Sequence, residues 1–376
     1  MKKVFLIAAA VVALAACSKN EVLPSSSINN EISFNVAPRT KALAHGQSAF
    51  GVDNHFISYA YFLTDDKKWP TNAGSIYING AEVSSHVDAS ATGGRVWKAA
   101  NSYYWPKSEK SSLTFFAWSK NKNECSLAGG ATVSCHPQKG IAFTDYDVTS
   151  NKNVDLLVAD VAANKTRNKN LYTYSGVPTL FRHKLSYVIF KVKTKEAYAG
   201  KEFALKSIKF VGLGSKASYD QKANDVNASV YNTVGEWDTP TATADQVYFN
   251  ATTPVVFTNS DDFVLETAAT AKDFVEQKYY LPQALTAVTP GDGVAGSIEV
   301  VYTIKTTEGT TEGTTEGTSV STETVTRYIS AKSMFADDLK INKKYTCTLT
   351  FSLDEITWDP AVQDWDPVTA ADITIQ

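Results

Sequence analysis

The sequence has few of the residues from which metal sites, catalytic sites and nucleic-acid interfaces are built. Among 376 residues there are four cysteines and five histidines, and they are not clustered. The 36 Lys and Arg nearly balance the 39 Asp and Glu, giving a formal net charge of -3 and no basic excess for nucleic acid. Metalloprotease, phosphate-loop and nucleophile-elbow motifs are also lacking. We therefore expect no metal, no cofactor, no nucleic-acid partner and no enzymatic activity.

The composition favours strands over helices. Hydrophobic residues make up 43% of the chain, with 18 Phe, 18 Tyr and 7 Trp, and Thr, Val and Ser are frequent. Aromatic and β-branched side chains suit pleated, half-buried surfaces. We expect an all-β fold rather than a disordered chain or a helical bundle.

The first sixteen residues are typical of a secretion signal. Lys2 and Lys3 precede an apolar run over residues 4–14, which is too short to span a bilayer. Leu14-Ala15-Ala16-Cys17 follows and resembles a bacterial lipobox. In that interpretation residues 1–16 are removed and Cys17 carries acyl chains that hold the protein on a membrane. The alternative is an ordinary signal peptide with a chance cysteine.

The segment 17–39 is predicted to be a tether followed by a removable strand. Residues 18–30 are mostly polar. Ile32, Phe34 and Val36 then alternate with smaller or polar residues, which is the period of a half-buried strand. Pro38 ends this strand, and Arg39 follows at a position that we expect to be exposed.

The remaining chain is predicted to form two domains, at 40–172 and 173–376. Short strands with turn signals between them, and no sustained helical period, favour β-sandwiches. The polar stretch 164–170 is the best internal joint, so the boundary is expected within 160–180. The expected strands after it are 185–192, 203–211, 247–249, 255–257, 263–265, 278–281, 297–305, 325–330 and 344–353.

Export would place the cysteines in an oxidising compartment. Cys125 and Cys135 flank a loop of small residues that could close into a disulfide, and the sequence leaves the bonded and the separate forms equally open. Cys347 alternates with apolar neighbours and is predicted to be a buried thiol.

Three further patterns have ordinary structural explanations. The run Gly291-Asp292-Gly293-Val294-Ala295-Gly296 fits a dinucleotide fingerprint, but a strand-like segment follows it where a helix is needed. Residues 306–317 repeat Thr-Thr-Glu-Gly three times, as expected of a solvated hairpin loop. Paired acidic residues such as Asp65-Asp66 lack the spacing of a calcium loop.

An ordered set of motifs resembles the fimbrillin family, the subunits of type V pili. The motifs are Trp97, Tyr103-Tyr104-Trp105-Pro106, Phe115-Phe116-Ala117-Trp118, Asp155-Leu156-Leu157-Val158-Ala159, Phe181-Arg182-His183-Lys184-Leu185-Ser186, Leu281-Pro282-Gln283 and Ile356-Thr357-Trp358. Together with the lipobox they span nearly the whole chain. The Thr-Thr-Glu-Gly repeat and the cysteine pair are not part of that pattern.

The resemblance implies two transthyretin-like β-sandwiches, export as a lipoprotein, trimming by an arginine-specific protease and assembly by strand exchange. Arg39 is then the expected cut site, with Lys41 as the fallback. Cutting would release the strand that carries Ile32, Phe34 and Val36 and open a groove. The donor for a neighbouring groove would be residues 371–376, with Ile373 and Ile375 as its apolar positions. The alternative is that this tail is simply the last strand of its own domain.

The function expected from these features is a structural or tip subunit of a pilus that supports adhesion. Its partners would be other pilins in a homo- or a hetero-polymer, an outer membrane before maturation, and a ligand on a host or bacterial surface. A second hypothesis is a surface lipoprotein that binds glycans in a nutrient-uptake system, which would need neither Arg39 nor a mobile C-terminal strand. A secreted glycosidase would require two converging carboxylates, for which the sequence gives no positive sign.

Overall fold

The structure is a computed structural model that describes residues 30–36, 50–88, 95–167, 176–224, 235–260, 263–289, 293–308 and 319–364. Nearly all of its regular secondary structure is strand, and the strands form three sheets. This confirms the prediction of an all-β fold. The finer prediction of two transthyretin-like sandwiches stays a prediction.

The first sheet contains the N-terminal strand. Its order is β10-β1-β4-β3-β2-β5-β8-β11, and β9 also pairs with β5. Its strands are β1 (Phe34–Val36), β2 (Phe56–Leu63), β3 (Ser75–Val87), β4 (Arg95–Ala99), β5 (Ser112–Ser119), β8 (Leu157–Ala159), β9 (Ala162–Lys165), β10 (Val177–Thr179) and β11 (Phe181–His183). All eight residues of β5 are buried, as expected of a strand inside a sheet that is covered on both faces.

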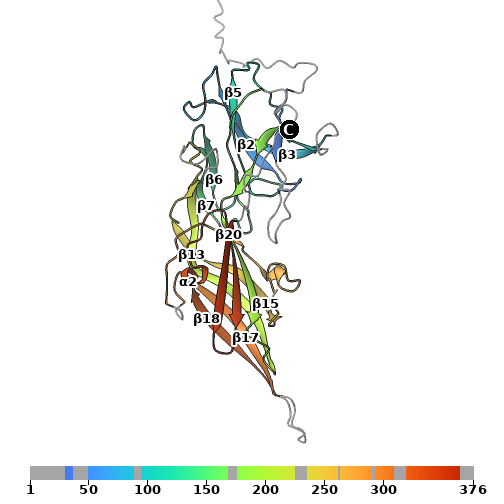
Figure 1. Cartoon of the computed structure of the whole chain (residues 1–376), viewed down its shortest axis with the longest axis vertical. Helices are drawn as coiled ribbons and strands as arrows, with labels where there is room; N and C mark the ends of the chain where they lie inside the picture. The colour runs from blue at the N-terminus through green and yellow to red at the C-terminus, as the bar shows by residue number, and fades with distance from the viewer. Residues whose placement is uncertain are drawn as a thin grey trace, which may run out of the picture.

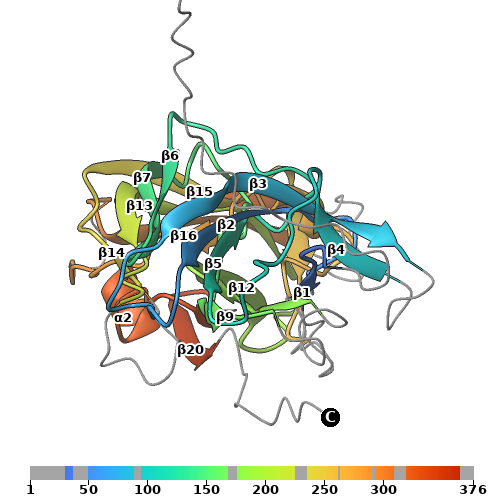
Figure 2. The same cartoon turned by 90° about the horizontal axis from the view of Figure 1, so that it is seen from above.

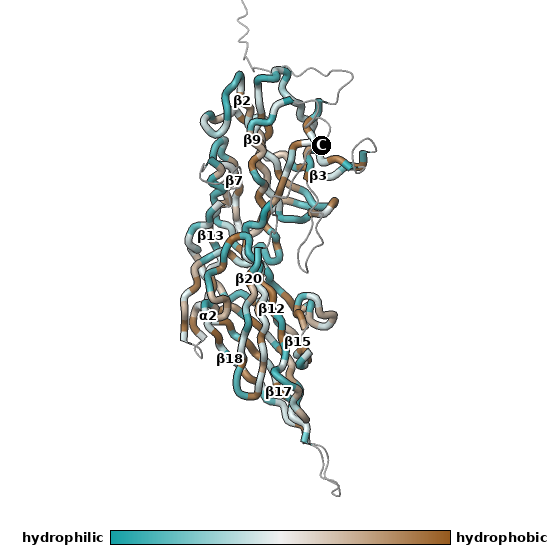
Figure 3. Tube along the Cα trace, in the orientation of Figure 1, coloured by the Kyte–Doolittle hydropathy of each residue, from teal (hydrophilic) through white to brown (hydrophobic). Residues whose placement is uncertain are grey.

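The second sheet is built around one long strand. Its order is β18-β17-β13-β7-β6, with β14 and β15 also paired to β13. Its strands are β6 (Thr132–His136), β7 (Gly140–Asp147), β13 (Lys201–Asp220), β14 (Glu236–Trp237), β15 (Ala242–Phe257), β17 (Ser297–Glu308) and β18 (Ser319–Ser330). Figure 3 shows hydrophobic and hydrophilic residues alternating along several of these strands, as expected where one face is buried.

The third sheet has the order β16-β12-β19-β20, so β20 is an edge strand among the described residues. Its strands are β12 (Ser186–Thr194), β16 (Tyr279–Tyr280), β19 (Lys343–Phe351) and β20 (Ile356–Asp364). Two short helices complete the regular elements of the described residues: the 3₁₀ helix η1 (Lys272–Phe274) and α2 (Ala331–Phe335). The side chain of Ser330 caps α2 by accepting from the Ser333 backbone N–H.

The molecule is elongated, with β2, β3 and β5 towards one end and β15, β17 and β18 towards the other (Figure 1). Strand β13 connects the two halves, because its first part pairs with β15 and β17 and its last residues pair with β7. At about 3.3 Å per residue such a strand spans roughly 65 Å. A hydrophobic cluster with members from β5, β7, β12 and β13 fills the junction, so apolar packing joins the halves.

The chain passes from the first sheet to the third within a few residues. Strands β10 and β11 lie after residue 172 in the sequence but still pair within the first sheet. The first strand of the third sheet begins at Ser186. The crossing therefore falls between His183 and Ser186.

The far end of the molecule is a long hairpin. Strands β17 and β18 pair without interruption from Ser297 with Ser330 to Glu308 with Ser319. Residues 309–318, which contain most of the Thr-Thr-Glu-Gly repeat, lie outside the described residues. Ser297 also directly follows the glycine pattern at 291–296, so a strand stands where a dinucleotide-binding helix would begin. No helix in the described part of the chain is long and apolar enough to cross a membrane.

Candidate functional site

The N-terminal strand β1 lies inside the first sheet. Phe34, Asn35 and Val36 pair in parallel with β10, and Phe34 pairs antiparallel with Trp97 of β4. Figure 2, seen from above, shows β1 beside β4. Because β1 has a neighbour on each side, its removal would leave two strands with unpaired backbone groups.

Backbone hydrogen bonds continue this pairing on the N-terminal side of β1. The Ile32 N–H donates to the Tyr103 carbonyl at 2.7 Å, and the Trp105 N–H donates to the Asn30 carbonyl at 2.9 Å. On the other side, the Val177 N–H donates to the Ser33 carbonyl at 2.7 Å. The segment 30–36 is therefore held as an extended ribbon along its whole described length.

The three alternating apolar residues of the ribbon point into the core. Ile32, Phe34 and Val36 are 3%, 4% and 7% exposed, whereas Asn35 is exposed to solvent. The three apolar residues are thus buried as expected from the sequence, although Ser33 between Ile32 and Phe34 is buried as well, at 9% exposure. Removing the ribbon would leave an apolar groove at the positions of these three side chains.

The middle of this groove is lined by aromatic rings. Phe34 meets Phe56 and Phe115 edge to face, with ring centroids 5.3 and 5.9 Å apart and interplanar angles of 87° and 89°. Three more rings continue the cluster behind Phe56: Trp97, Phe181 and Phe50. We call Phe50, Phe56, Trp97, Phe115 and Phe181 the aromatic pocket.

A glycine allows β10 to approach the ribbon closely. Gly176 has φ +79°, and a Cβ atom built on it would lie 2.7 Å from the Phe34 carbonyl carbon and 2.9 Å from the Asn35 nitrogen. No local sequence pattern singles out this residue, because the strand that packs against it is distant in the sequence. The aromatic pocket was missed for the same reason, although several of its rings belong to the motifs noted above.

An ion pair fixes the N-terminal end of the ribbon. The Glu31 carboxylate accepts hydrogen bonds from Lys98 at 2.8 Å and from the Ser102 hydroxyl at 2.6 Å. Burial alone would raise the pKa of Glu31, but these two bonds and the charge of Lys98 outweigh it, so the pKa is lowered. The contact stabilises β1 above the usual pKa of a glutamate and is lost as the pH falls through the lowered pKa.

Two of the sequence motifs meet at the other end of the first sheet. Strand β11 pairs antiparallel with β8, and the His183 Nδ1 lies 2.7 Å from the Asp155 Oδ1. Both side chains are buried. Arg182 forms a further ion pair with Asp160 at 2.9 Å. These residues join two strands and have a structural role.

Lys184, between β11 and β12, is buried at the junction of the two halves. It is 1% exposed, its Nζ lies 6.0 Å from the Tyr219 ring centroid, and its carbonyl accepts a hydrogen bond from the Trp237 indole at 2.6 Å. Burial lowers the pKa of Lys184 to about 7, although the charge of Asp160 opposes this shift.

The Lys184→Met variant is expected to be more stable than the natural chain by about 1–2 kcal/mol at pH 7, because it buries no charge. Between pH 7 and 10.5 the unfolded chain holds a proton on Lys184 that the folded chain releases, so the natural chain gains stability as the pH rises. The variant should lack this contribution. Urea unfolding from pH 6 to 10 measures both effects. The control is Lys206→Met at an exposed position of β13, and equal pH dependence in all three chains would contradict the prediction.

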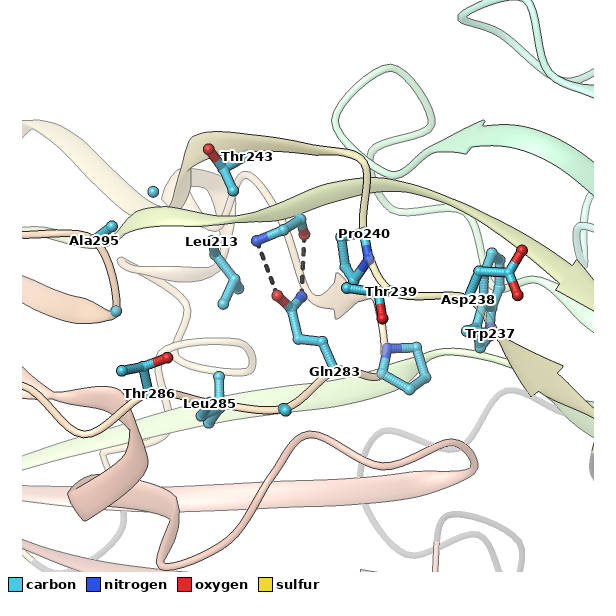
Figure 4. A pocket seen from close by; sticks show the side chains of 15 residues that line it. Leu213, Trp237, Asp238, Thr239, Pro240, Thr243, Gln283, Leu285, Thr286 and Ala295 are labelled. Atoms are coloured by element: carbon cyan, nitrogen blue, oxygen red, sulfur yellow. Dashed lines mark hydrogen bonds between the residues drawn. The ribbon is translucent and has the colours of Figure 1, made fainter.

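A surface cavity of about 370 Å³ lies beside β13 and is lined by Leu213, Trp237, Pro240 and Gln283 among others (Figure 4). The Gln283 side-chain amide forms hydrogen bonds with the backbone of the fold. Its Oε1 accepts from the Gly214 N–H at 2.9 Å, and its Nε2 donates to the Gly214 carbonyl at 3.1 Å. It therefore supports β13 where the strand is irregular, which gives the glutamine of the Leu-Pro-Gln motif a structural role.

Several predicted site residues lie outside the described part of the chain. These are Cys17, Arg39, Lys41, Ile373 and Ile375, and their roles stay predictions. Cys125 and Cys135 are described, as separate half-buried thiols. Burial raises the pKa of each to about 12. The disulfide stays a prediction, and Cys347 is a buried thiol as expected. Among the described residues, no three His, Cys, Asp or Glu gather closely enough to hold a metal ion.

Comparison with known proteins identifies relatives by structure and by family. A fimbrial protein from Bacteroides vulgatus is 18% identical with a TM-score of 0.62, covering 90% of this chain and 100% of its own. A candidate cell adhesion protein from Bacteroides uniformis is 16% identical with a TM-score of 0.42, covering 92% and 100%. One from Parabacteroides distasonis is 11% identical with a TM-score of 0.39, covering 90% and 97%. No curated protein sequence matches the chain.

The first of these structures shows a shared fold. The fimbrillin-like family profile matches residues 60–365, which is most of the chain and includes all the aromatic pocket except Phe50 and Phe56. The resemblance expected from the sequence motifs is thus confirmed by an independent comparison. The chain belongs to the fimbrillin-like family.

Proposed function

We propose that the chain is a structural or tip subunit of a pilus that supports adhesion, and that β1 occupies the site where subunits join. The observation that carries the proposal is the position of β1. It is a short buried ribbon between β10 and β4, and it lies only a few residues before Arg39 in the sequence. A cut after Arg39 would detach this ribbon from the body without breaking any described strand.

The precursor is protected from premature assembly because its own ribbon fills the groove. Burying each of the large side chains Ile32, Phe34 and Val36 contributes roughly 1.5–3 kcal/mol, and the backbone hydrogen bonds add to this. Once the ribbon is removed, β10 and β4 present unpaired backbone groups, which an extended segment of another subunit can satisfy. The proposal involves no catalytic step.

The anchor and the donor complete this scheme. Acyl chains on Cys17 hold the exported precursor in the outer membrane, and the cut after Arg39 releases the body from them. The described chain ends at Asp364 of the edge strand β20. Residues 371–376, with Ile373 and Ile375, follow and are the strand given to the next subunit. The finished subunit stands at the cell surface in contact with other pilins.

The proposal is tested by limited proteolysis of a lipid-free chain that begins at Ser18. Trace trypsin is expected to make one early cut and to give a product that begins at Thr40, with polymers forming afterwards. N-terminal sequencing and gel filtration measure the two results. The chain with both Arg39→Ala and Lys41→Ala should stay monomeric, whereas the Lys41→Ala control should behave like the natural chain. Diffuse cutting, or a clean cut without polymers at any concentration, would contradict the assembly role.

A further inference from the structure

The groove under β1 has three side-chain positions, those of Ile32, Phe34 and Val36, and they suit different types of residue. At the middle position, the Phe34 ring is held edge to face by Phe56 and Phe115, two rings that come from different strands and are almost fully buried. At the outer positions the occupants are the aliphatic side chains of Ile32 and Val36. The described geometry thus suits an aromatic residue flanked by two aliphatic residues, each two positions away.

An aliphatic side chain would fit the middle position poorly. Edge-to-face contacts depend on the polarised ring edge, which an aliphatic group lacks. The rings that line the position are themselves fixed by neighbours: Phe56 contacts Trp97 and Phe181, and Phe115 contacts Trp105 with ring centroids 5.8 Å apart. Because packed cores relax only partly, a narrower side chain would leave a void there.

The backbone of the incoming strand is also positioned closely. Gly176 contacts the backbone at Phe34 and Asn35, and the Val177 N–H donates to the Ser33 carbonyl. These contacts set the depth of any strand in the groove and the positions at which its side chains point inward. A donor that slides by two residues moves its aromatic residue to an outer position. It then loses an aliphatic contact at one end of the groove.

The C-terminal tail of this chain does not meet these requirements. Its alternating positions are Ala371, Ile373 and Ile375, so an isoleucine would stand where Phe34 stands. We propose that the groove prefers a donor strand with an aromatic residue between two aliphatic residues, supplied by another kind of subunit, and that it binds the tail of a second copy of this chain more weakly. The inference depends on the proposed function, because it concerns the strand that replaces β1.

Competition between peptides tests this selectivity without altering the acceptor. The chain cut after Arg39 is mixed with a fluorescein-labelled peptide of residues 30–39, and unlabelled peptides compete for the groove. The Phe34→Tyr peptide is expected to compete like the natural sequence. The Phe34→Ile peptide should be weaker by about tenfold or more, because it loses two aromatic contacts.

The tail peptide of residues 366–376 provides the converse test. It should compete at least about tenfold more weakly than peptide 30–39, and Ile373→Phe should recover most of that difference. The matched control, Ile375→Phe, carries the same added ring at an outer position and should recover little.

Two results would overturn this inference and leave the proposed function standing. One is that the Phe34→Ile peptide competes as well as the natural peptide, and the other is that the tail peptide competes as well as peptide 30–39. A different result bears on the proposed function. If the natural peptide 30–39 fails to bind the cut chain at all, the groove is not a strand-exchange site, and both proposals fall.

Discussion

Replacing Phe34 by alanine is expected to lower the free energy of unfolding of the precursor by about 3–5 kcal/mol, the usual cost of removing a buried phenylalanine ring. The ring is 4% exposed and makes two edge-to-face contacts with Phe56 and Phe115. The resulting cavity lies in the middle of the groove, so the loss should fall mainly on the attachment of β1. After the cut at Arg39, the fragment that carries β1 should also leave faster.

The neighbouring residue provides the control for this prediction. Asn35 lies in the same strand, keeps the same backbone pairing with β10 and is exposed. Asn35→Ala should therefore change the stability by no more than about 0.5 kcal/mol. Urea unfolding measures both variants. Similar stability of Phe34→Ala and the natural chain would mean that β1 contributes little to the precursor, and the protective role given to it would be wrong.

The ribbon itself could be predicted from sequence, but its surroundings could not. Alternation at Ile32, Phe34 and Val36 shows which side of a strand is buried. It carries no information about the neighbours β4 and β10, which come from residues more than sixty and more than one hundred positions later in the sequence. The contact with Gly176 depends on that pairing, so sequence analysis had no means of finding it.

Strand lengths were the weakest part of the prediction, because bulges and prolines interrupt the alternation of residues. The predicted strand 203–211 is the first half of β13, which continues through register shifts near Gly212 and Gly214 to Asp220. Glycine permits the bulge, and the Gln283 amide supports the backbone there.

Strand β20 shows how an edge tolerates a residue that an inner strand would exclude. The strands expected from the sequence before the tail end with 344–353, so none was predicted around Pro360. In the structure Pro360 pairs with Cys347 inside β20. Because β20 is the edge of its sheet, only one of its sides needs backbone donors, and a proline can be accommodated.

Gly176→Ala is expected to destabilise the precursor by about 2–4 kcal/mol, through two separate effects. The first is the positive φ of +79°, which disfavours any side chain. The second is steric, because the new methyl group would lie 2.7 Å from the Phe34 carbonyl carbon and would push against the β1 backbone. Backbone atoms inside a sheet cannot rotate away as a flexible side chain can, so the ribbon itself must shift.

Gly130→Ala separates these two effects. Gly130 has a similar φ of +77°, but a Cβ atom there would meet nothing within 4 Å. Its substitution should cost only the backbone effect, about 1 kcal/mol. The loss of unfolding free energy in Gly176→Ala minus the loss in Gly130→Ala, both measured by urea unfolding, therefore measures the contact with β1.

After the cut at Arg39, the fragment carrying β1 should leave faster from the Gly176→Ala chain and at the natural rate from the Gly130→Ala chain. Equal release from both would show that the ribbon is not held against β10 as described, and a donor strand would then have no fixed backbone position in this groove.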